Sequence, residues 1–390
     1  MKFTRLLFAA LILLFLPATI GVLAQEQLNS NTLNAVLNVQ KYERAIHIMA
    51  MLILGFGFLM VFVRHYGRSA LTATFLLVSI SLPVYYALSG IYFLSIPQVP
   101  IERLIFAEFA AASLLITAGA VLGRLKMIHY LILGVIFVAF YMLNEWIVIN
   151  GATTLIPVGG FVDTGGSIVI HAFGAIFGLS AAYFNTRKEH IDIPIEADAT
   201  SDRYSMLGSM VLWVFWPSFC SALVAPELIP MTIINVIMAL CGSTLATYVI
   251  STLIRGKISI TDMANASLAG GVAIGSTCNQ ANTIEAMVIG ILAGVISTLG
   301  FASLQTRMQK LIRLIDTCGV SNLHGLPGLL GGFSAIVVVS GINSSYQLTG
   351  IAFTVVLAIA GGSFAGKLIS FFGMNKLPYT DSSEFLDAEY

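Results

Sequence analysis

The chain has 390 residues, of which 57% are hydrophobic and only 10% are charged, and its mean hydropathy is +0.91. This composition excludes an ordinary soluble protein of two or three domains and indicates an all-α polytopic membrane protein. The 19 basic and 19 acidic residues balance, so no net charge attracts nucleic acid. The four cysteines show no spacing typical of a disulfide or metal site, and we expect no cofactor and no metal.

Residues 1–24 have the layout of a signal peptide. Lys2 and Arg5 precede an apolar stretch from Leu6 to Leu16, which Pro17 interrupts before small residues and a polar segment. Cleavage after this segment would leave the mature N-terminus outside the cell. The alternative is an uncleaved first membrane span, because the apolar stretch is nearly long enough to cross a bilayer.

Eleven apolar segments follow the polar lead, each near the roughly 20 residues that a helix needs to cross the hydrocarbon core. We predict a membrane domain over residues 25–372, followed by a short tail over 373–390. The predicted spans are 44–63, 70–94, 104–123, 127–149, 163–184, 204–223, 230–254, 262–280, 283–303, 316–340 and 347–372.

Basic residues fall almost entirely after odd-numbered spans, whereas the opposite loops hold one, Arg103. Cytoplasmic loops of membrane proteins carry the excess of Lys and Arg, so this asymmetry places the N-terminus outside and the C-terminus in the cytoplasm of a plasma (inner) membrane protein. The tail is acidic, and we expect it either to be solvated or to dock on the basic inner loops. Its carboxylates are Asp381, Glu384, Asp387 and Glu389.

One motif occurs twice. The segment from Asp163 to His171 recurs as Asp316 to His324, with the same Asp-to-His offset. Two repeats of five spans, approximately 44–184 and 204–340, fit this spacing, and the last helix lies outside them. Because five is odd, the second repeat must enter the membrane from the opposite side, as in many transporters.

Each His lies eight residues, about 12 Å along a helix, beyond its Asp. His171 and His324 are therefore expected near the middle of the membrane, where an ionisable group normally faces a cavity and has a function. The alternative is a pair of structural histidines bonded to neighbouring helices. Asp163 and Asp316 lie at opposite faces and suit helix caps, although Asp163 could also shape the field of an outer cation site.

These residues resemble the Rh branch of the ammonium transporter (Amt/Mep/Rh) superfamily over nearly the whole mature chain. The matching stretches are specific because they are long and ordered. They include Asp163 to Gly178, Phe215-Trp216-Pro217-Ser218-Phe219, Asn265 to Ala273, and Asp316 to Gly332 with its Cys-Gly-Val-Ser-Asn-Leu-His-Gly-Leu-Pro-Gly core.

The resemblance implies a homotrimer with a separate channel in each subunit, which recruits ammonium, deprotonates it and conducts ammonia. His171 and His324 match the twin pore histidines of the family, and Phe109 and Phe219 match its stacked phenylalanine gate. The implied partners are ammonium or ammonia, the lipid bilayer and two further copies of the chain.

The resemblance also implies roles for three acidic residues. Asp163 matches the carboxylate below the outer vestibule, Glu145 matches the acidic vestibule residue, and Glu108 stands where the family usually has Asp. Cys220 stands where Asn is common. Leu223 lies where the Amt branch offers a hydroxyl to an outer ammonium ion, which argues against a tight outer cation site.

Three other functions remain to be weighed. The same pore would suit carbon dioxide or methylamine-like analogues, since nothing in an apolar lumen excludes them. An ammonium sensor with little flux is disfavoured because the tail is too short for a signalling domain. An intramembrane hydrolase is disfavoured because the paired histidines have no nearby Ser or Cys motif and no H-E-x-x-H, so we expect no enzyme.

Overall fold

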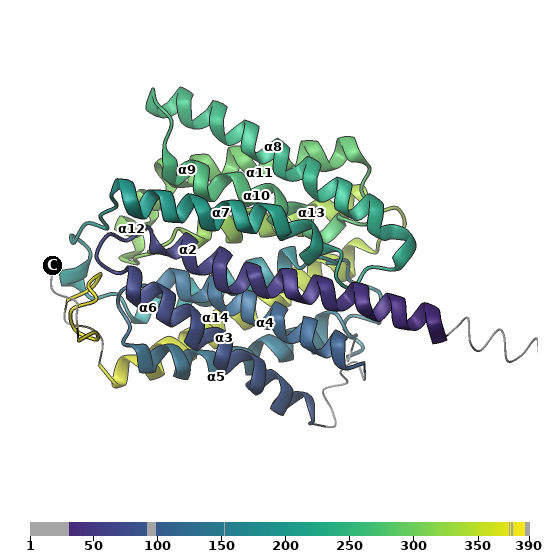
Figure 1. The fold of residues 1–390 in the computed structure, drawn as a ribbon, viewed down its shortest axis with the longest axis horizontal. Helices are drawn as coiled ribbons and strands as arrows, with labels where there is room; N and C mark the ends of the chain where they lie inside the picture. The colour runs from purple at the N-terminus through teal and green to yellow at the C-terminus, as the bar shows by residue number, and fades with distance from the viewer. Residues whose placement is uncertain (1–30, 92–98, 152, 374, 376, 387–390) are drawn as a thin grey trace, which may run out of the picture.

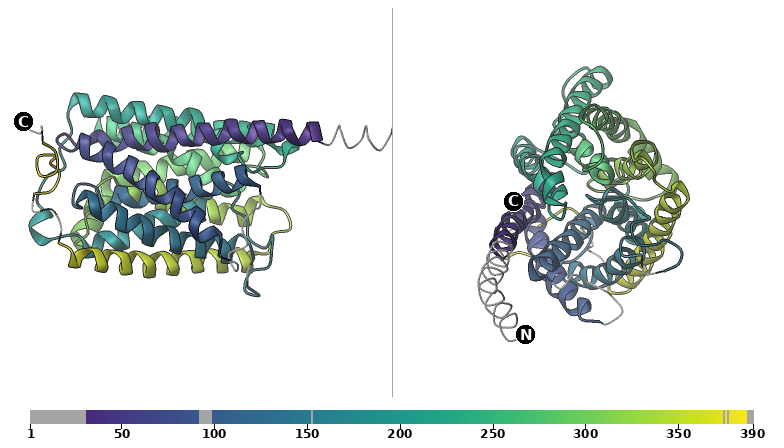
Figure 2. Two further views of the ribbon diagram at one scale, coloured as in Figure 1. Left: turned by 60° about the horizontal axis from the view of Figure 1, so that its bottom comes forward. Right: turned by 90° about the vertical axis from the view of Figure 1, so that its right-hand side faces the viewer.

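The computed structural model describes residues 31–91, 99–151, 153–373, 375 and 377–386, and within them it is almost entirely helical. The long helices run side by side along one direction and form a bundle (Figures 1 and 2). The predicted signal peptide lies outside the described residues. The chain is an all-helical polytopic membrane protein, as its composition predicts.

The helices follow one another with short connections. Their bounds are a first helix Asn31–Phe62 that contains the π-helical turn η1 (Met51–Phe56), then α3 (Gly67–Ser89), α4 (Pro100–Val121), α5 (Met127–Val148), the π-helical turn η3 (Ser167–Ala172) with α6 (Phe173–Phe184), α7 (Ala199–Cys220), α8 (Ile229–Arg255), α9 (Ile260–Asn265), α10 (Ala269–Ile274), α11 (Thr283–Leu299), α12 (Gln305–Ile312), the π-helical turn η9 (Ser321–Gly325) with α13 (Leu326–Val338), and α14 (Ser344–Phe371).

Within the described residues, eight helices are long and apolar enough to cross a membrane. They are Asn31–Phe62, Gly67–Ser89, Pro100–Val121, Met127–Val148, Ser167–Phe184, Pro226–Arg255, Thr283–Ile312 and Ser344–Phe371. The other predicted spans are helical as well, but they are shorter, interrupted or less apolar: α7, the segment with α9 and α10, and η9 with α13. The exact number of crossings therefore stays a prediction.

Two of the approximate span boundaries differ most from the ends of the helices. The first helix already includes Asn31, well before the predicted start at residue 44, because the polar lead contains no Gly or Pro that would stop a helix. The ninth span continues through α12 to Ile312 rather than ending at residue 303. Hydropathy shows where a helix becomes polar, but it does not show where the helix ends. This helix ends at Arg313, whose backbone φ of 53° is left-handed.

Small residues bring three helices into backbone contact. A Cβ at Gly290 of α11 would lie 2.1 Å from the carbonyl oxygen of Ala239 on α8, and one at Gly270 of α10 would lie 2.0 Å from the same oxygen. Neither distance is possible for a real side chain. Since lipid provides no hydrophobic force between helices, this close approach of small residues is the usual way in which membrane helices pack.

The C-terminal tail docks on the ends of two helices. The Asp381 carboxylate accepts hydrogen bonds from the backbone N–H groups of Arg68 (3.1 Å) and Ser69 (2.9 Å) in the first turn of α3. The Glu384 carboxylate accepts one from the N–H of Met127 (2.9 Å) at the start of α5. The tail thus binds the positive ends of two helix dipoles. Asp387 and Glu389 lie outside the described residues.

A glycine makes room for the tail. Gly123 has a φ of +82°, and a Cβ there would lie 2.3 Å from the ring of Tyr379. The backbone N–H of Tyr379 donates to the Gly123 carbonyl over 3.0 Å. The ring therefore packs directly on the connection between α4 and α5, where only glycine fits both the backbone conformation and the space.

Replacing Asp381 with Ala is expected to destabilise the protein by about 1 kcal/mol, because it removes the acceptor of two N–H groups at the start of α3. Thermal unfolding of the detergent-solubilised protein measures the effect as a lower midpoint. Ser383→Ala, an exposed position in the same tail, is the matched control and should leave the midpoint unchanged. Equal midpoints for both variants would contradict the capping role.

Candidate functional site

A cavity of about 400 Å³ opens at the end of the bundle opposite the docked tail. Its lining includes Ile149 at the end of α5, whereas the tail binds the start of that helix. Glu145, Asp163 and Leu223 also line it. The cavity thus combines two carboxylates with apolar and aromatic walls.

Two phenylalanines from different helices pack together beside this cavity. Phe109 comes from α4 and Phe219 from α7, and their ring centroids are 4.7 Å apart with an interplanar angle of 50°. Both rings are buried, and Phe109 belongs to the cavity lining. Phe219 also lies 6.3 Å from the His171 ring. The pair therefore links the lining of the cavity to the surroundings of His171.

His171 and His324 meet inside the bundle, as their equal offsets from an Asp predict. Their Nδ1 atoms are 3.2 Å apart and their rings are nearly parallel, with an interplanar angle of 6°. One Nδ1 must donate and the other accept, so the two imidazoles are held in complementary tautomers when neutral. His171 Nε2 is buried and, in the described part of the chain, has no hydrogen-bond partner.

Each histidine lies in a π-helical turn. The N–H groups of Ile170 and His171 both donate to the Gly166 carbonyl, each over 3.0 Å, which widens the helix by one residue at this point. His324 lies in the corresponding turn η9. Such turns occur mostly as single interruptions of α-helices and are frequent at functional sites.

Carboxylates cap both of these turns. Asp163 accepts from the N–H groups of Ile168 (3.1 Å) and Val169 (2.8 Å) and from the Ser276 hydroxyl (2.6 Å). Asp316 accepts from Val320 N–H and Ser321 N–H, each over 2.9 Å. Both aspartates therefore bond helix-end amides that would otherwise be unsatisfied inside the protein.

Two further rings enclose the histidines, and the sequence did not single them out. Trp216 stacks on His171 with centroids 5.5 Å apart, and Phe56 stacks on His324 at 6.3 Å. Trp216 lies three residues before Phe219 on α7, and this spacing puts both side chains on one helix face. The spacing was the signal in the sequence that Trp216 lies on the same side of the helix as the predicted gate residue. Phe56 and His324 also line a small cavity of about 20 Å³ beyond the histidine pair.

The two glutamates occupy different environments. Glu145 lines the cavity of about 400 Å³ and accepts a 2.6 Å hydrogen bond from the Tyr85 hydroxyl. Glu108 is 1% exposed and does not line the cavity, although its neighbour Phe109 does. Successive residues of a helix point about 100° apart, so one side chain faces the cavity and the other packs away from it.

Comparison with known proteins decides the family. The sequence profile of the Ammonium Transporter Family matches residues 4–387. The chain belongs to this family. It is 35% identical to the ammonium transporter Rh type B of Mus musculus over 371 residues, which cover 86% of this chain and 78% of the relative. It is 37% identical to the Rh type A protein of Rattus norvegicus over 309 residues, covering 77% and 67%.

Solved structures agree with this assignment. The structure described as Nitrosomonas europaea Rh50, from the Rhesus protein family of channels, is 53% identical with a TM-score of 0.88, covering 91% of this chain and 93% of that chain. Candida albicans Mep2 is 16% identical with a TM-score of 0.71, covering 84% and 82%, and shows the shared fold alone. The protein is therefore an Rh-type member of the ammonium transporter family.

Two residues of this Rh-type protein, Leu223 and Cys220, were noted in its sequence as departures from the family pattern, and the structure shows their surroundings. Leu223 lines the cavity and supplies no hydroxyl there. The Cys220 thiol packs against the backbone of Gly165, since a Cβ on that glycine would lie 2.9 Å from its sulfur. Within the described ranges, no three His, Cys, Asp or Glu side chains gather as a metal site requires.

Ser276→Ala should destabilise this Rh-type protein by about 1.5–3 kcal/mol, because it removes a 2.6 Å hydrogen bond to the buried Asp163 carboxylate. Ser303→Ala is the control, since its exposed hydroxyl only bonds the preceding turn of its own helix. Thermal unfolding in detergent compares the two variants. A Ser276→Ala midpoint equal to that of Ser303→Ala would exclude a stabilising role for this hydroxyl.

Proposed function

We propose that the protein is an ammonia channel whose outer mouth is the cavity of about 400 Å³. Ammonium is recruited in this outer cavity and releases its proton to solvent water there, and ammonia then passes the paired histidines. The observation that carries the proposal is the contact between His171 and His324, which lies between the outer cavity and the small inner cavity. The phenylalanine pair separates the first of these cavities from the histidines.

The surroundings of the histidines favour a neutral species over an ion. The rings around them belong to Trp216, Phe219 and Phe56, and none carries a charge. A bare ion entering such an environment loses several kcal/mol or more of hydration, whereas ammonia loses only weaker hydrogen bonds. Two neutral imidazoles offer a donor and an acceptor without a permanent charge. Potassium, which resembles ammonium in size and charge, would be excluded.

The acidic residues divide into recruiting and structural groups in this proposal. Glu145 faces the outer cavity and attracts ammonium, while the Tyr85 hydroxyl holds its side chain in place. Asp163 and Asp316 act first as helix caps, since their carboxylates bond helix-end amides. Glu108, which is buried behind the Phe109 face of α4, serves structure rather than recruitment.

The resemblance to the Rh branch and the distribution of basic residues also support a membrane topology and an oligomeric state. We propose eleven crossings in two inverted five-helix repeats plus a last helix, a cleaved signal peptide, and an outer N-terminus with a cytoplasmic tail. The protein would then be a homotrimer in the plasma membrane. The outer cavity would face outward, because it lies opposite the docked tail.

Stopped-flow measurements on proteoliposomes test the function. Vesicles with the protein should alkalinise faster than empty vesicles when an ammonium salt is added, because ammonia enters and takes up protons. His171→Ala and His324→Ala should each change the ammonia rate or let potassium pass. A rate equal to that of empty vesicles for the unaltered protein would refute the channel and would leave the sensor as the better reading.

Carbon dioxide needs a separate readout, because the same uncharged surroundings would admit it. Vesicles loaded with carbonic anhydrase should acidify on addition of carbon dioxide at the rate of protein-free vesicles if the pore prefers ammonia. Faster acidification that His171→Ala abolishes would make the protein a gas channel of broader selectivity.

The phenylalanine pair gives a second prediction. Phe219→Ala should raise the osmotic water permeability of the proteoliposomes, because it removes one of the two rings that separate the outer cavity from the histidines. Phe364→Ala, which removes a 55% exposed ring on α14, is the control. Equal water permeabilities in the two variants would show that the pair is not the barrier.

A further inference from the structure

The two segments that carry the histidines each follow a residue whose backbone is bonded by side chains. Val162 comes directly before the capping Asp163, and Ile315 comes directly before the capping Asp316. Neither residue lies in a helix, so its N–H and carbonyl need other partners. In both cases, side chains from other parts of the bundle bond the N–H and the carbonyl of the same residue.

Gln347, in the first turn of α14, holds Val162. Its Oε1 accepts from the Val162 N–H over 2.9 Å, and its Nε2 donates to the Val162 carbonyl over 3.0 Å. The same Nε2 donates to the carbonyl of Gly332 on α13 over 3.2 Å. Gln347 is fully buried. This Gln347 bridge joins the start of the His171 segment to the helix that follows His324.

Arg124 and Thr186 hold Ile315 in a corresponding way. The guanidinium donates to the Ile315 carbonyl over 2.9 Å and to the Thr186 hydroxyl over 2.7 Å. The same hydroxyl accepts from the Ile315 N–H over 3.3 Å. Thr186 follows α6, the helix that continues the π-helical turn of His171. This Arg124 bridge therefore joins the start of the His324 segment to the end of the His171 helix.

The two bridges are crossed. Each one fixes the start of one histidine segment against a later part of the other, so the segments are bonded to each other on both sides of the point where His171 and His324 meet. The Nδ1 atoms of the two rings are 3.2 Å apart, and a hydrogen bond is lost beyond about 3.5 Å. A small slide of one segment along the other would therefore end the contact, and directional bonds on both sides resist such a slide.

The Arg124 bridge depends on hydrogen bonds rather than on an ion pair. Arg124 is fully buried, and in the described ranges of the chain no carboxylate pairs with it directly. Its guanidinium also donates to the carbonyl of Ala120 on α4. A guanidinium presents its N–H groups in a rigid planar fork, so it holds several oxygens in set directions. Burying this charge is costly, and the bonds that offset the cost are those that fix Ile315.

We propose that Arg124, Thr186 and Gln347 are positioning residues for the histidine pair. They set the separation of the two imidazoles and so maintain the hydrogen bond between the Nδ1 atoms. They act through the backbone of Val162 and Ile315, not by contact with the rings. That the pair lies on a path for ammonia rests on the proposed function, but the positioning of the rings does not.

The distance between the two Nδ1 atoms tests the proposal, measured by crystallography of each variant. Arg124→Met and Gln347→Met keep an unbranched side chain and remove its hydrogen-bonding groups. Each should lengthen the distance from 3.2 Å to more than about 3.5 Å, so that the hydrogen bond is lost. Thr186→Val and Gln347→Glu are milder changes to the same bridges. They should have the same effect, and they decide the outcome if a Met variant does not fold.

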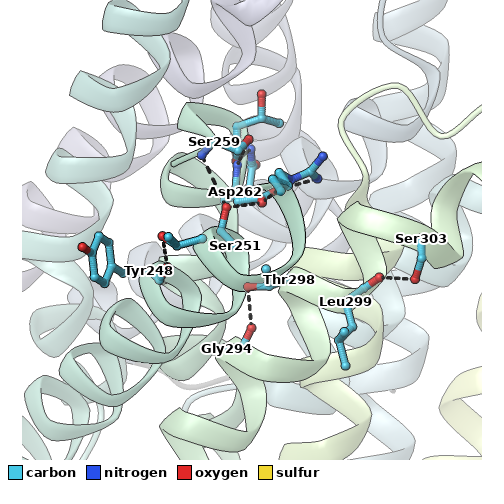
Figure 3. Close-up of polar contacts among 12 residues, drawn as sticks. Tyr248, Ser251, Ser259, Asp262, Gly294, Thr298, Leu299 and Ser303 are labelled. Carbon is cyan, nitrogen blue, oxygen red and sulfur yellow. Dashed lines mark hydrogen bonds and ion pairs between the residues drawn. The ribbon is translucent and has the colours of Figure 1, made fainter. Parts of the chain in front are cut away.

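Two buried hydrogen bonds between other helices provide the controls. Thr354→Val removes a 3.0 Å bond from α14 to Asn144 of α5. Ser251→Ala removes a 2.7 Å bond to the buried Asp262, which links α8 to α9 (Figure 3). Both variants should lower the midpoint of thermal unfolding but leave the Nδ1 distance at 3.2 Å.

Nδ1 atoms that stay within hydrogen-bond distance in the variants of both bridges would overturn the proposal, as would equal shifts in the two controls. A shift in the variants of one bridge alone would refute the role of the other. In proteoliposomes, the bridge variants should change the ammonia rate or the exclusion of potassium in the same direction as His171→Ala. If the unaltered protein conducts no ammonia, the channel is refuted, whereas the Nδ1 distance still decides whether the bridges position the rings.

Discussion

Backbone N–H groups at helix starts inside the bundle must find acceptors, and the rest of the structure depends on how they do. No water is available in the hydrocarbon region to satisfy them, so an uncapped helix start would cost several kcal/mol. Asp163 and Asp316 supply the acceptors for the two helices that carry the histidines. At the end of the bundle, Asp381 of the tail caps the start of α3. The position of the histidine pair follows from where these helices are allowed to begin.

The chemistry of the site is arranged around an uncharged centre. Carboxylates occur in the cavity of about 400 Å³ and at the capped turns, whereas aromatic rings surround His171 and His324. Because a charge costs least where water reaches it, this order would keep the proposed recruitment of ammonium and the proposed passage of ammonia in different places. Membership in the ammonium transporter family makes ammonium and ammonia the natural pair of species for such an arrangement.

Sequence alone predicted the parts that depend on composition and local spacing. Apolar runs located the helices, and the equal Asp-to-His offsets predicted that the histidines belong together, because both signals follow from the rise of a helix. The spacing of Trp216 from Phe219 put both on one helix face, but the stacking of Trp216 on His171 and of Phe56 on His324 depends on which helices become neighbours. The orientation of Glu108 depends on the rotation of α4. The bonds of the tail join residues more than 250 positions apart, which no local pattern encodes.

The π-helical turns constrain how the segments that carry His171 and His324 can change in length. Two hydroxyl bonds, each 2.7 Å long, join this part of the chain to α4: the Ser113 hydroxyl donates to the Ile170 carbonyl inside the turn, and the Thr117 hydroxyl donates to the Gly174 carbonyl in α6, beyond the turn. Losing the extra residue of the turn would rotate everything after it by about 100° and break the bond between Thr117 and Gly174. Insertions and deletions between the capping aspartates and the histidines should therefore be much rarer among relatives than substitutions at the same positions.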